Sequence, residues 1–221
     1  MSMFRFSFAR RPYLMLGLAV AAGLGASALL QWAPPSGMQL TRTPVVRDVL
    51  GDAGSPAFGA ARPEVTVVVF TDYQCGVCKA TDGALLKLLE TDPTVRVVFK
   101  DWPIRGPASD LAARMALAAH RQGRYLEVHK ALMTARGALT PERIAAIAQD
   151  AGVDLDLARR HAREVETQIG RHNTQAFGLG LQGTPGYIIG PYLVPGGLDE
   201  RNLALIVERA RRAGPPKPPQ P

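Results

Sequence analysis

Short apolar runs in this chain are separated by stretches in which apolar residues recur at helical spacing. Val65–Thr71 is almost wholly apolar, which is typical of a strand buried on both faces of a sheet. Val95–Lys100 is a second such run. Tyr187–Ile189 and Tyr192–Val194 lie on either side of a Gly-Pro pair, as the strands of a hairpin do. We therefore expect four strands, the last two forming a hairpin.

Helices are expected between and after these runs. Apolar spacing and capping residues predict helices at 75–90, 110–122, 125–134 and 144–151, one or two more within 154–177, and a last one at 200–212. A strand–helix–strand unit requires a right-handed crossover and a parallel strand pair. The element order therefore predicts an α/β, thioredoxin-like fold with a helical insertion at about 106–180.

The N-terminus has the pattern of a membrane-targeting helix. Tyr13–Ala33 carries no charge and follows Arg5, Arg10 and Arg11. About 20 apolar residues cross a bilayer, and positive residues stay on the cytoplasmic side. We expect residues 1–33 to be either an uncleaved signal anchor, which we favour, or a signal peptide cleaved after Ala28. Either outcome exports the rest of the chain.

Proline and glycine divide the remainder of the chain. Residues 34–63 are expected to form a Pro/Gly-rich linker, in which 45–50 could pack onto the domain edge. Residues 64–213 would be the globular domain. Residues 214–221 would be a disordered Pro-rich tail.

Composition changes this picture little. The formal net charge is +7, but the arginines are spread along the chain and no aromatic–basic cluster accompanies them. We interpret the charge as a solvated basic surface and expect no nucleic-acid partner.

The chain has two cysteines, Cys75 and Cys78, directly after the first apolar run. A C-x-x-C pair at the start of a helix is typical of a redox site, because free backbone N–H groups lower the pKa of the first thiol. Cys75 would attack or be attacked, and Cys78, one turn on, would close the disulfide. Gly76 and Val77 supply no donor side chain, so stabilisation of the thiolate would come from the helix end and from groups such as Lys79. No cofactor other than the disulfide is needed.

A metal is the competing use of such a pair. Zinc requires two further Cys or His ligands at close spacing, and the four histidines (His120, His129, His161 and His172) form no such pair. Residue 79 is lysine, which excludes a C-x-x-C-H haem motif. We predict no metal site, and we interpret the histidines as surface or helix-packing residues.

A second candidate element precedes the hairpin. Pro185, in Gly183-Thr184-Pro185-Gly186, stands where a strand begins, a position that suits a proline with a cis bond. The backbone of Thr184 would then be free to pair with an added peptide strand. Thr184 and Pro185 are our candidate substrate-binding residues.

Together these stretches resemble the DsbA-like thiol:disulfide oxidoreductases, in the DsbG/Com1/BdbD branch of the thioredoxin fold. The motifs that carry the resemblance are Val49-Leu50-Gly51-Asp52 with Ser55-Pro56, Val67 to Lys79, Val97 to Ile104, Gly183-Thr184-Pro185 and Val194-Pro195-Gly196. The resemblance extends from about residue 45 to residue 212.

The resemblance implies Cys75 as nucleophile, Cys78 as resolving cysteine and Pro185 as a cis-proline facing the disulfide. Some relatives carry a buried acid six residues before the first cysteine, where this chain has Val69. Asp72 or Asp101 could supply the proton relay instead, although Asp72 is equally well interpreted as a strand-end cap.

Three functions remain open at this point. The first is a periplasmic oxidase of exported proteins, anchored at the inner membrane or soluble if cleaved, and reoxidised by a DsbB-like partner. The second is a reductase or isomerase kept reduced by a DsbD-like donor. The third is a thiol-binding or copper-chaperone module, although no methionine or histidine flanks the cysteines. Only about 30 residues separate Ala33 from the first strand, too few for a dimerisation domain, which favours a monomer and oxidation.

Overall fold

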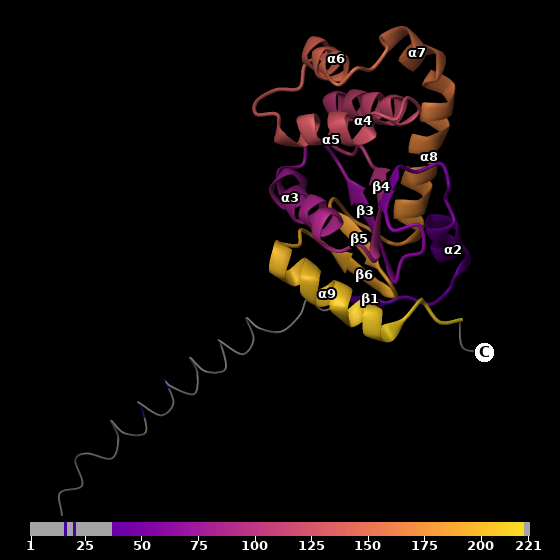
Figure 1. Ribbon diagram of the computed structural model, residues 1–221, viewed down its shortest axis with the longest axis vertical. Coiled ribbons are helices and arrows are strands. Elements are labelled where there is room, and N and C mark those ends of the chain that lie inside the picture. The colour runs from indigo at the N-terminus through magenta and orange to yellow at the C-terminus, as the bar shows by residue number, and fades with distance from the viewer. Residues whose placement is uncertain (1–15, 17–19, 21–36, 219–221) are drawn as a thin grey trace, which may run out of the picture. The chain divides into compact units, whose positions relative to one another are not determined.

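The computed structural model describes residues 16, 20 and 37–218, and residues 37–218 form a mixed β-sheet covered by helices (Figure 1). Within this range the sheet has six strands in the order β1-β6-β5-β3-β4-β2. β3 (Val65–Thr71) and β4 (Val95–Asp101) are neighbours in this order and are parallel, with Thr71 opposite Asp101 at their carboxyl ends. This pair is the expected strand–helix–strand unit.

The hairpin lies on the other side of β3. β5 (Gly186–Ile189) pairs antiparallel with β3, and β6 (Tyr192–Pro195) pairs antiparallel with β5. Gly190 turns the hairpin at φ +54°, and a Cβ there would lie 2.8 Å from Ala210 Cβ, so the turn requires glycine. The mixed α/β, thioredoxin-like architecture is confirmed.

Helices cover both faces and one end of the sheet. α3 and α9 pack on one face, and α2 and α8 pack on the other, while α4 to α7 lie beyond one end of the strands (Figure 1). The cysteines lie in the larger of the two hydrophobic cores, on the α3 face. The helices are α2 (Pro44–Leu50), α3 (Gly76–Thr91), α4 (Pro107–His120), α5 (Tyr125–Thr134), α6 (Pro141–Asp150), α7 (Leu155–Arg160), α8 (Ala162–Gly178) and α9 (Glu200–Ala213).

The prediction that residues 34–63 form a linker is wrong for residues 37–63, the part that the structure describes. β1 (Met38–Gln39) pairs with β6, and β2 (Ala57–Gly59) pairs with β4, so this segment supplies both edge strands. α2, between them, buries Val46 and Val49 almost completely, as expected for a segment packed on the domain edge. Two of the residues that suggested a tether, Pro44 and Gly51, are the first residue and the C-cap of α2.

A buried ion pair fastens this segment to the sheet. Lys100 Nζ lies 2.5 Å from Asp52 Oδ2, and neither side chain has accessible surface. Asp52 Oδ2 also accepts hydrogen bonds from Ser55 Oγ (2.9 Å) and Gln168 Nε2 (2.9 Å). Because unpairing a buried charge costs about 3–5 kcal/mol, residues 52–55 are an integral part of the domain. The Asp52 and Ser55 motif of the sequence thus has a structural role.

The two ends differ from expectation in different ways. Arg42 N donates to Lys217 O at 2.8 Å, and Thr41 forms a bridge with Lys217, so the start of the expected disordered tail is paired. Residues 219–221 lie outside the described residues, as does the expected N-terminal membrane helix apart from residues 16 and 20. No helix in the described ranges is long and apolar enough to cross a membrane.

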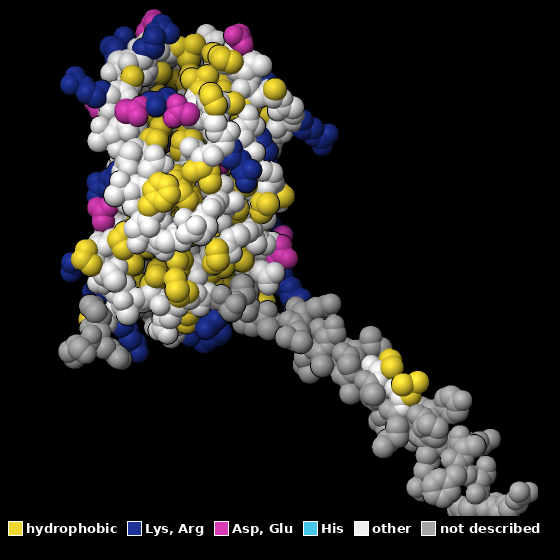
Figure 2. Space-filling view, turned by 180° about the vertical axis from the view of Figure 1, so that it is seen from behind, with side chains coloured by type: hydrophobic (Ala, Val, Ile, Leu, Met, Phe, Trp, Pro, Cys, Tyr) yellow, Lys and Arg dark blue, Asp and Glu magenta, His cyan; other side chains and the backbone are white. Residues whose placement is uncertain are grey.

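Lys and Arg side chains are spread over the face of the molecule seen in Figure 2 and do not gather in one basic patch there. This distribution agrees with a solvated basic surface.

Candidate active site

The first cysteine caps the helix that carries the second. Cys75 is the N-cap residue of α3, and its Sγ accepts a hydrogen bond from Cys78 N at 3.3 Å. Cys75 N donates to Asp72 O at 3.1 Å, which closes the turn between β3 and α3. Both cysteines are free thiols with 0% and 2% exposure, so Cys75 is not the exposed tip that its position suggested. Its sulfur lies at the positive end of the helix dipole.

The candidate residues Thr184 and Pro185 meet this pair from the far end of the chain. The Thr184–Pro185 peptide bond is cis, and the Cys75 thiol donates to Thr184 O at 3.3 Å. Gly196 N donates a hydrogen bond to Pro185 O at 2.9 Å. The fold therefore brings together all four residues singled out by the sequence.

An open groove adjoins the proline loop. Its volume is about 520 Å³, and it lies between the loop that precedes β5, the end of β6 and the edge residue Met38. The residues that line it include Leu181, Gly183, Thr184, Pro185, Pro195 and Gly196. An extended peptide laid in this groove would pass directly beside Thr184.

The pKa values of the two thiols are shifted in opposite directions. Burial alone raises the pKa of Cys75, but hydrogen bonds from the Cys78 side chain and backbone outweigh it, and the pKa falls below its usual value. Burial, reinforced by the Cys75 side chain, raises the pKa of Cys78 to about 12. Since the thiolate is the nucleophile, Cys75 is the reactive sulfur of the pair.

The cation near Cys75 is not the one expected. Lys79 Nζ points away from the sulfurs and donates to Leu132 O at 2.7 Å and to Ala135 O at 3.0 Å, at the C-terminal end of α5. The positive charge that helps to lower the pKa of Cys75 belongs to Arg105, in the loop after β4. Arg105 was missed because it is 30 residues from Cys75 in the sequence.

Asp72 is a structural acid. Its carboxylate accepts hydrogen bonds from Gln74 N (2.7 Å), Ser109 Oγ (2.6 Å), Ile104 N (2.8 Å) and Arg105 N (3.1 Å). Four donors hold it in place and join the cysteine turn to the loop after β4. The strand-end cap interpretation of Asp72 therefore agrees with the structure.

Asp101 begins a series of buried polar side chains that we name the buried polar chain. It consists of Asp101, Tyr125, Tyr73, His129 and Asp82. Tyr125 OH donates to Asp101 Oδ1 at 3.1 Å, and the two tyrosine oxygens are 3.5 Å apart. Tyr73 OH lies 2.9 Å from His129 Nδ1, and His129 Nε2 lies 2.9 Å from Asp82 Oδ1. All five residues are buried.

Most members of the buried polar chain were not predicted from the sequence. His129 was interpreted as a surface or packing residue, and neither tyrosine was considered. One signal was present, because Asp82 follows Cys78 by four residues and precedes Leu85 by three on the buried face of α3. An acid inside an apolar helix stripe indicates a buried partner.

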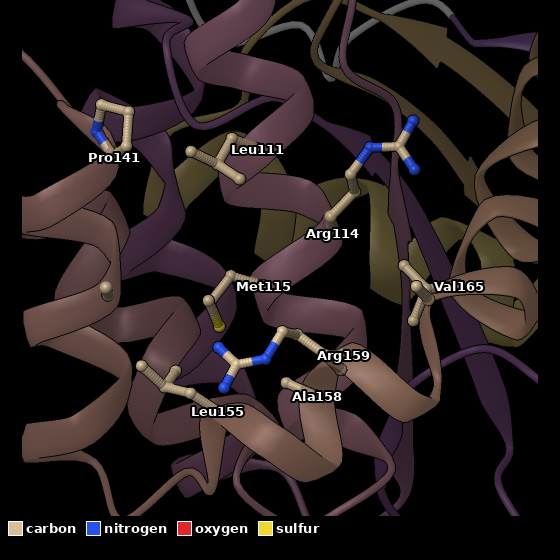
Figure 3. A pocket seen from close by; sticks show the side chains of 11 residues that line it. Leu111, Arg114, Met115, Pro141, Leu155, Ala158, Arg159 and Val165 are labelled. Atoms are coloured by element: carbon tan, nitrogen blue, oxygen red, sulfur yellow. The ribbon is translucent and has the colours of Figure 1, made fainter.

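A hollow of about 330 Å³ lies away from the cysteines, between helices α4, α6, α7 and α8 (Figure 3). Leu111, Met115 and Leu155 line it with several alanines, and its arginines are paired with acids: Arg114 with Asp110 and Glu166, Arg159 with Asp156.

Across residues 37–218, no three His, Cys, Asp or Glu side chains cluster as metal ligands would.

The fold and the C-x-x-C turn define a thioredoxin-like redox protein. The chain belongs to the DsbA-like thioredoxin domain family, whose sequence model matches residues 66–208. The family resemblance inferred from the motifs is thus confirmed, and the domain is a thiol–disulfide oxidoreductase domain.

Several solved structures are similar to it. A thioredoxin-like oxidoreductase from Silicibacter pomeroyi is 37% identical, with a TM-score of 0.72 over 75% of this chain and 97% of that one. A periplasmic thioredoxin-like protein from Salmonella enterica is 33% identical (TM-score 0.68; 76% and 96% covered). The thiol-disulfide exchange protein α-DsbA2 from Wolbachia pipientis is 32% identical (TM-score 0.70; 74% and 90% covered).

Curated relatives are longer proteins. The Na⁺/H⁺ antiporter NhaA 3 of Salinispora tropica is 30% identical over 144 residues, which cover 61% of this chain and 22% of the antiporter. The chain thus spans about a fifth of the length of the curated relatives that it matches.

Proposed function

We propose that this protein is a periplasmic thiol:disulfide oxidase, which passes a Cys75–Cys78 disulfide to cysteine pairs in exported proteins. The observation that carries the proposal is the contrast between the thiols. The Cys75 sulfur is capped by Cys78 N at 3.3 Å, and its pKa is lowered, whereas burial raises the pKa of Cys78 to about 12. A stabilised Cys75 thiolate is a good leaving group and favours the reduced form, which makes the disulfide oxidising.

The reaction proceeds in two exchanges. A substrate thiolate attacks Cys75 Sγ, the Cys75–Cys78 bond breaks, and Cys78 leaves as a thiolate that takes up one proton. The second substrate thiolate then attacks the substrate sulfur of the mixed disulfide, and Cys75 leaves as a stabilised thiolate. The substrate loses two electrons and the protein gains them, so an electron acceptor of the DsbB type is required for the next turnover.

Thr184 and Pro185 would bind the substrate peptide. The peptide would lie in the groove beside the proline loop and pair with the backbone of Thr184, whose carbonyl lies 3.3 Å from Cys75 Sγ. This arrangement would hold a substrate sulfur over Cys75.

The proposal includes where the protein acts and in which oligomeric state. The charge-free segment after Arg11 would deliver the domain to the periplasm, as a signal anchor or as a cleaved peptide. The similar Salmonella protein is described as periplasmic. We propose that residues 37–218 act there as a monomer.

The test measures the redox state of the two cysteines in living cells. Cells are quenched in acid, and Cys75 and Cys78 are alkylated with a reagent that adds measurable mass. Mostly oxidised thiols support the oxidase, and mostly reduced thiols support instead a reductase or isomerase supplied by a DsbD-like donor.

Cys78→Ser should accumulate mixed disulfides with exported proteins, because the resolving thiol is gone. Cys75→Ser is the matched control and should form none. Absence of adducts in Cys78→Ser would contradict the proposed exchange in either direction.

A further inference from the structure

The chain segments that meet at the cysteines carry almost no charge. They are residues 73–78, the loop 102–107 after β4, the proline loop 180–186, and residues 194–198 at the end of β6. Arg105 is the one charged side chain in these four segments. The charged residues that flank them already have hydrogen-bond partners within the protein; they are Asp72, Lys79, Asp101 and Asp199. An approaching peptide therefore meets a neutral surface with a single positive charge.

The guanidinium of Arg105 is available to a ligand. The residue is exposed, and no residue in the described part of the chain gives its side chain an ion pair or a hydrogen bond. Two acids near it already have partners. The Asp72 carboxylate is 1% exposed and accepts four hydrogen bonds, one of them from Arg105 N at 3.1 Å. Asp110, in the first turn of α4, is paired with Arg114 at 2.6 Å.

The backbone of Arg105 is fixed beside the nucleophile. Asp72 Oδ2 accepts hydrogen bonds from Ile104 N at 2.8 Å and from Arg105 N at 3.1 Å. The backbone carbonyl of Asp72 also accepts from Cys75 N at 3.1 Å, so one residue holds both loops. Burial raises the pKa of Cys75, but hydrogen bonds from Cys78 and the charge of Arg105 lower it. The positive charge therefore acts on the space around the sulfur.

Arg105 and the groove lie on opposite sides of Cys75. The strand order places β5 on one side of β3 and β4 on the other. The start of β5 and the end of β4 both pair with the carboxyl end of β3, which leads to Cys75. The proline loop precedes β5, and the Arg105 loop follows β4. None of the described residues that line the groove is charged. A peptide that crosses Cys75 from the groove thus reaches Arg105 beyond it.

We propose that Arg105 selects substrates in which an acidic side chain lies next to the reacting cysteine, on the side away from the residues that occupy the groove. The inference rests on the proposed exchange at Cys75, for which it names the substrate class. An Asp or Glu of the substrate would pair with the guanidinium while uncharged residues lie in the groove beside Thr184. A lysine at the same place would meet an unpaired like charge and be disfavoured.

The expected selectivity is modest and depends on salt. An exposed ion pair changes an equilibrium or rate by about threefold. Complementary charge acts chiefly on the rate of encounter and on the exclusion of wrong partners. Both effects weaken when salt shortens the range of charge interactions, from about 10 Å at 0.1 M to about 3 Å at 1 M.

Attack on Cys75 is measured alone in the full chain. Cys78→Ser protein, the reference protein, is treated with dithiodipyridine, which leaves Cys75 in a mixed disulfide with an uncharged thiopyridyl group. A peptide thiolate attacks Cys75 Sγ, the bond to the thiopyridyl sulfur breaks, and the released thiopyridone is followed by its absorbance. Each rate is divided by the rate of the same peptide with free dithiodipyridine. This ratio corrects for the different acidities of the peptide thiols.

The peptides contain one cysteine and differ at one position. One is neutral, one has aspartate before the cysteine, one has aspartate after it, and two carry lysine at the same positions. At low salt the reference protein should favour aspartate over the neutral peptide by about threefold at one of the two positions and disfavour lysine there. High salt should reduce this preference.

Substitutions of Arg105 in the reference protein test the assignment. Arg105→Gln should bring the aspartate-to-neutral ratio to about one, and Arg105→Glu should favour lysine at the same position by about threefold. Arg62→Gln is the matched control. It removes the same charge from an exposed residue that precedes the amino end of β3, the end opposite the cysteines, and should keep the preference.

The inference is overturned if Arg105→Gln keeps the aspartate preference of the reference protein, or if the reference protein has none. A purely structural role of Arg105, or an effect on the acidity of Cys75 alone, would change all peptide rates by one factor and leave their ratios unchanged. Equal preference for aspartate before and after the cysteine would contradict the placement of Arg105 and the groove on opposite sides.

The proposed exchange is tested separately with the same peptides. Oxidised protein that retains both cysteines is mixed with each peptide in excess, and reduction of the Cys75–Cys78 disulfide is measured by alkylation. If no peptide reduces it, the exchange fails and the inference with it. If the peptides reduce it at rates that do not depend on Arg105 and peptide charge together, the exchange stands and the selectivity alone is wrong.

Discussion

Each cysteine owes its chemistry to a few atoms around it. Cys75 is the cap of α3 and its sulfur accepts a hydrogen bond from Cys78 N, whereas Cys78 lies one turn further along the helix, and both are buried. The sequence predicted this asymmetry because helix position alone determines it. It could not predict Arg105, Tyr73 or His129 as neighbours, because their proximity depends on how separate elements pack and no local pattern encodes that.

Two buried groups make stability depend on pH in opposite directions. Burial, and then the charge of Lys100, lower the pKa of His172 from 6.5 to about 3, so the unfolded state binds more protons below pH 6.5 and stability falls as the pH falls. Asp101, whose pKa is raised to about 6, stabilises the fold as pH falls through 6 towards 4. Each slope reaches about 1.4 kcal/mol per pH unit inside its window.

We therefore predict that Asp101→Asn steepens the loss of stability between pH 6 and pH 4.5 by about 1–2 kcal/mol, because the compensating group is gone. His172→Gln should flatten the loss over the same range. Urea unfolding followed by circular dichroism at several pH values measures both. Parallel curves for wild type and Asp101→Asn would contradict the assignment of a raised pKa.

At the scale of elements, the regular strands and helices were predictable and the short edge elements were not. β3, β4 and α4 to α9 show apolar periodicity over four or more residues. β1 and β2 have two and three residues, too few to show a period. They are strands because the neighbouring strand offers free backbone groups, a property of the sheet and not of the segment.

Two glycines should respond oppositely to substitution by alanine. A Cβ added at Gly83, in the middle of α3, would meet no atom within 4 Å, so Gly83→Ala should stabilise the protein by about 0.5–1 kcal/mol. Gly59 has φ +100°, and a Cβ there would lie 2.3 Å from Val95 O, so Gly59→Ala should destabilise it by more than about 1 kcal/mol. Urea midpoints at constant slope compare the two, and equal shifts would be inconsistent with this geometry.

At the scale of the whole molecule, the domain begins earlier than its sequence suggested. Asp52, on the segment expected to be a linker, is the counter-ion of buried Lys100. β2 covers the edge of β4. The boundary at residue 64 was inferred from composition, and composition does not reveal that a polar residue has a buried partner elsewhere.

A fragment of residues 64–213 should consequently fail to unfold cooperatively, because it leaves Lys100 unpaired at a cost of about 3–5 kcal/mol. A fragment of residues 37–218 should unfold in one transition. Thermal unfolding followed by near-ultraviolet circular dichroism compares them, and a cooperative transition in the shorter fragment would show that the segment is dispensable.

Lys79 fixes α3 to the C-terminal end of α5. Its ammonium group bonds to three carbonyl oxygens, of Leu132, Met133 and Ala135, where α5 ends. α3, which is capped by Cys75 and carries Cys78, is thereby fixed to α5 of the helical insertion, and we expect the two helices to move as one rigid body. We therefore expect adaptation to substrates of different shape to occur in the groove beside the proline loop, whose lining includes Gly180 and Gly196, both at positive φ.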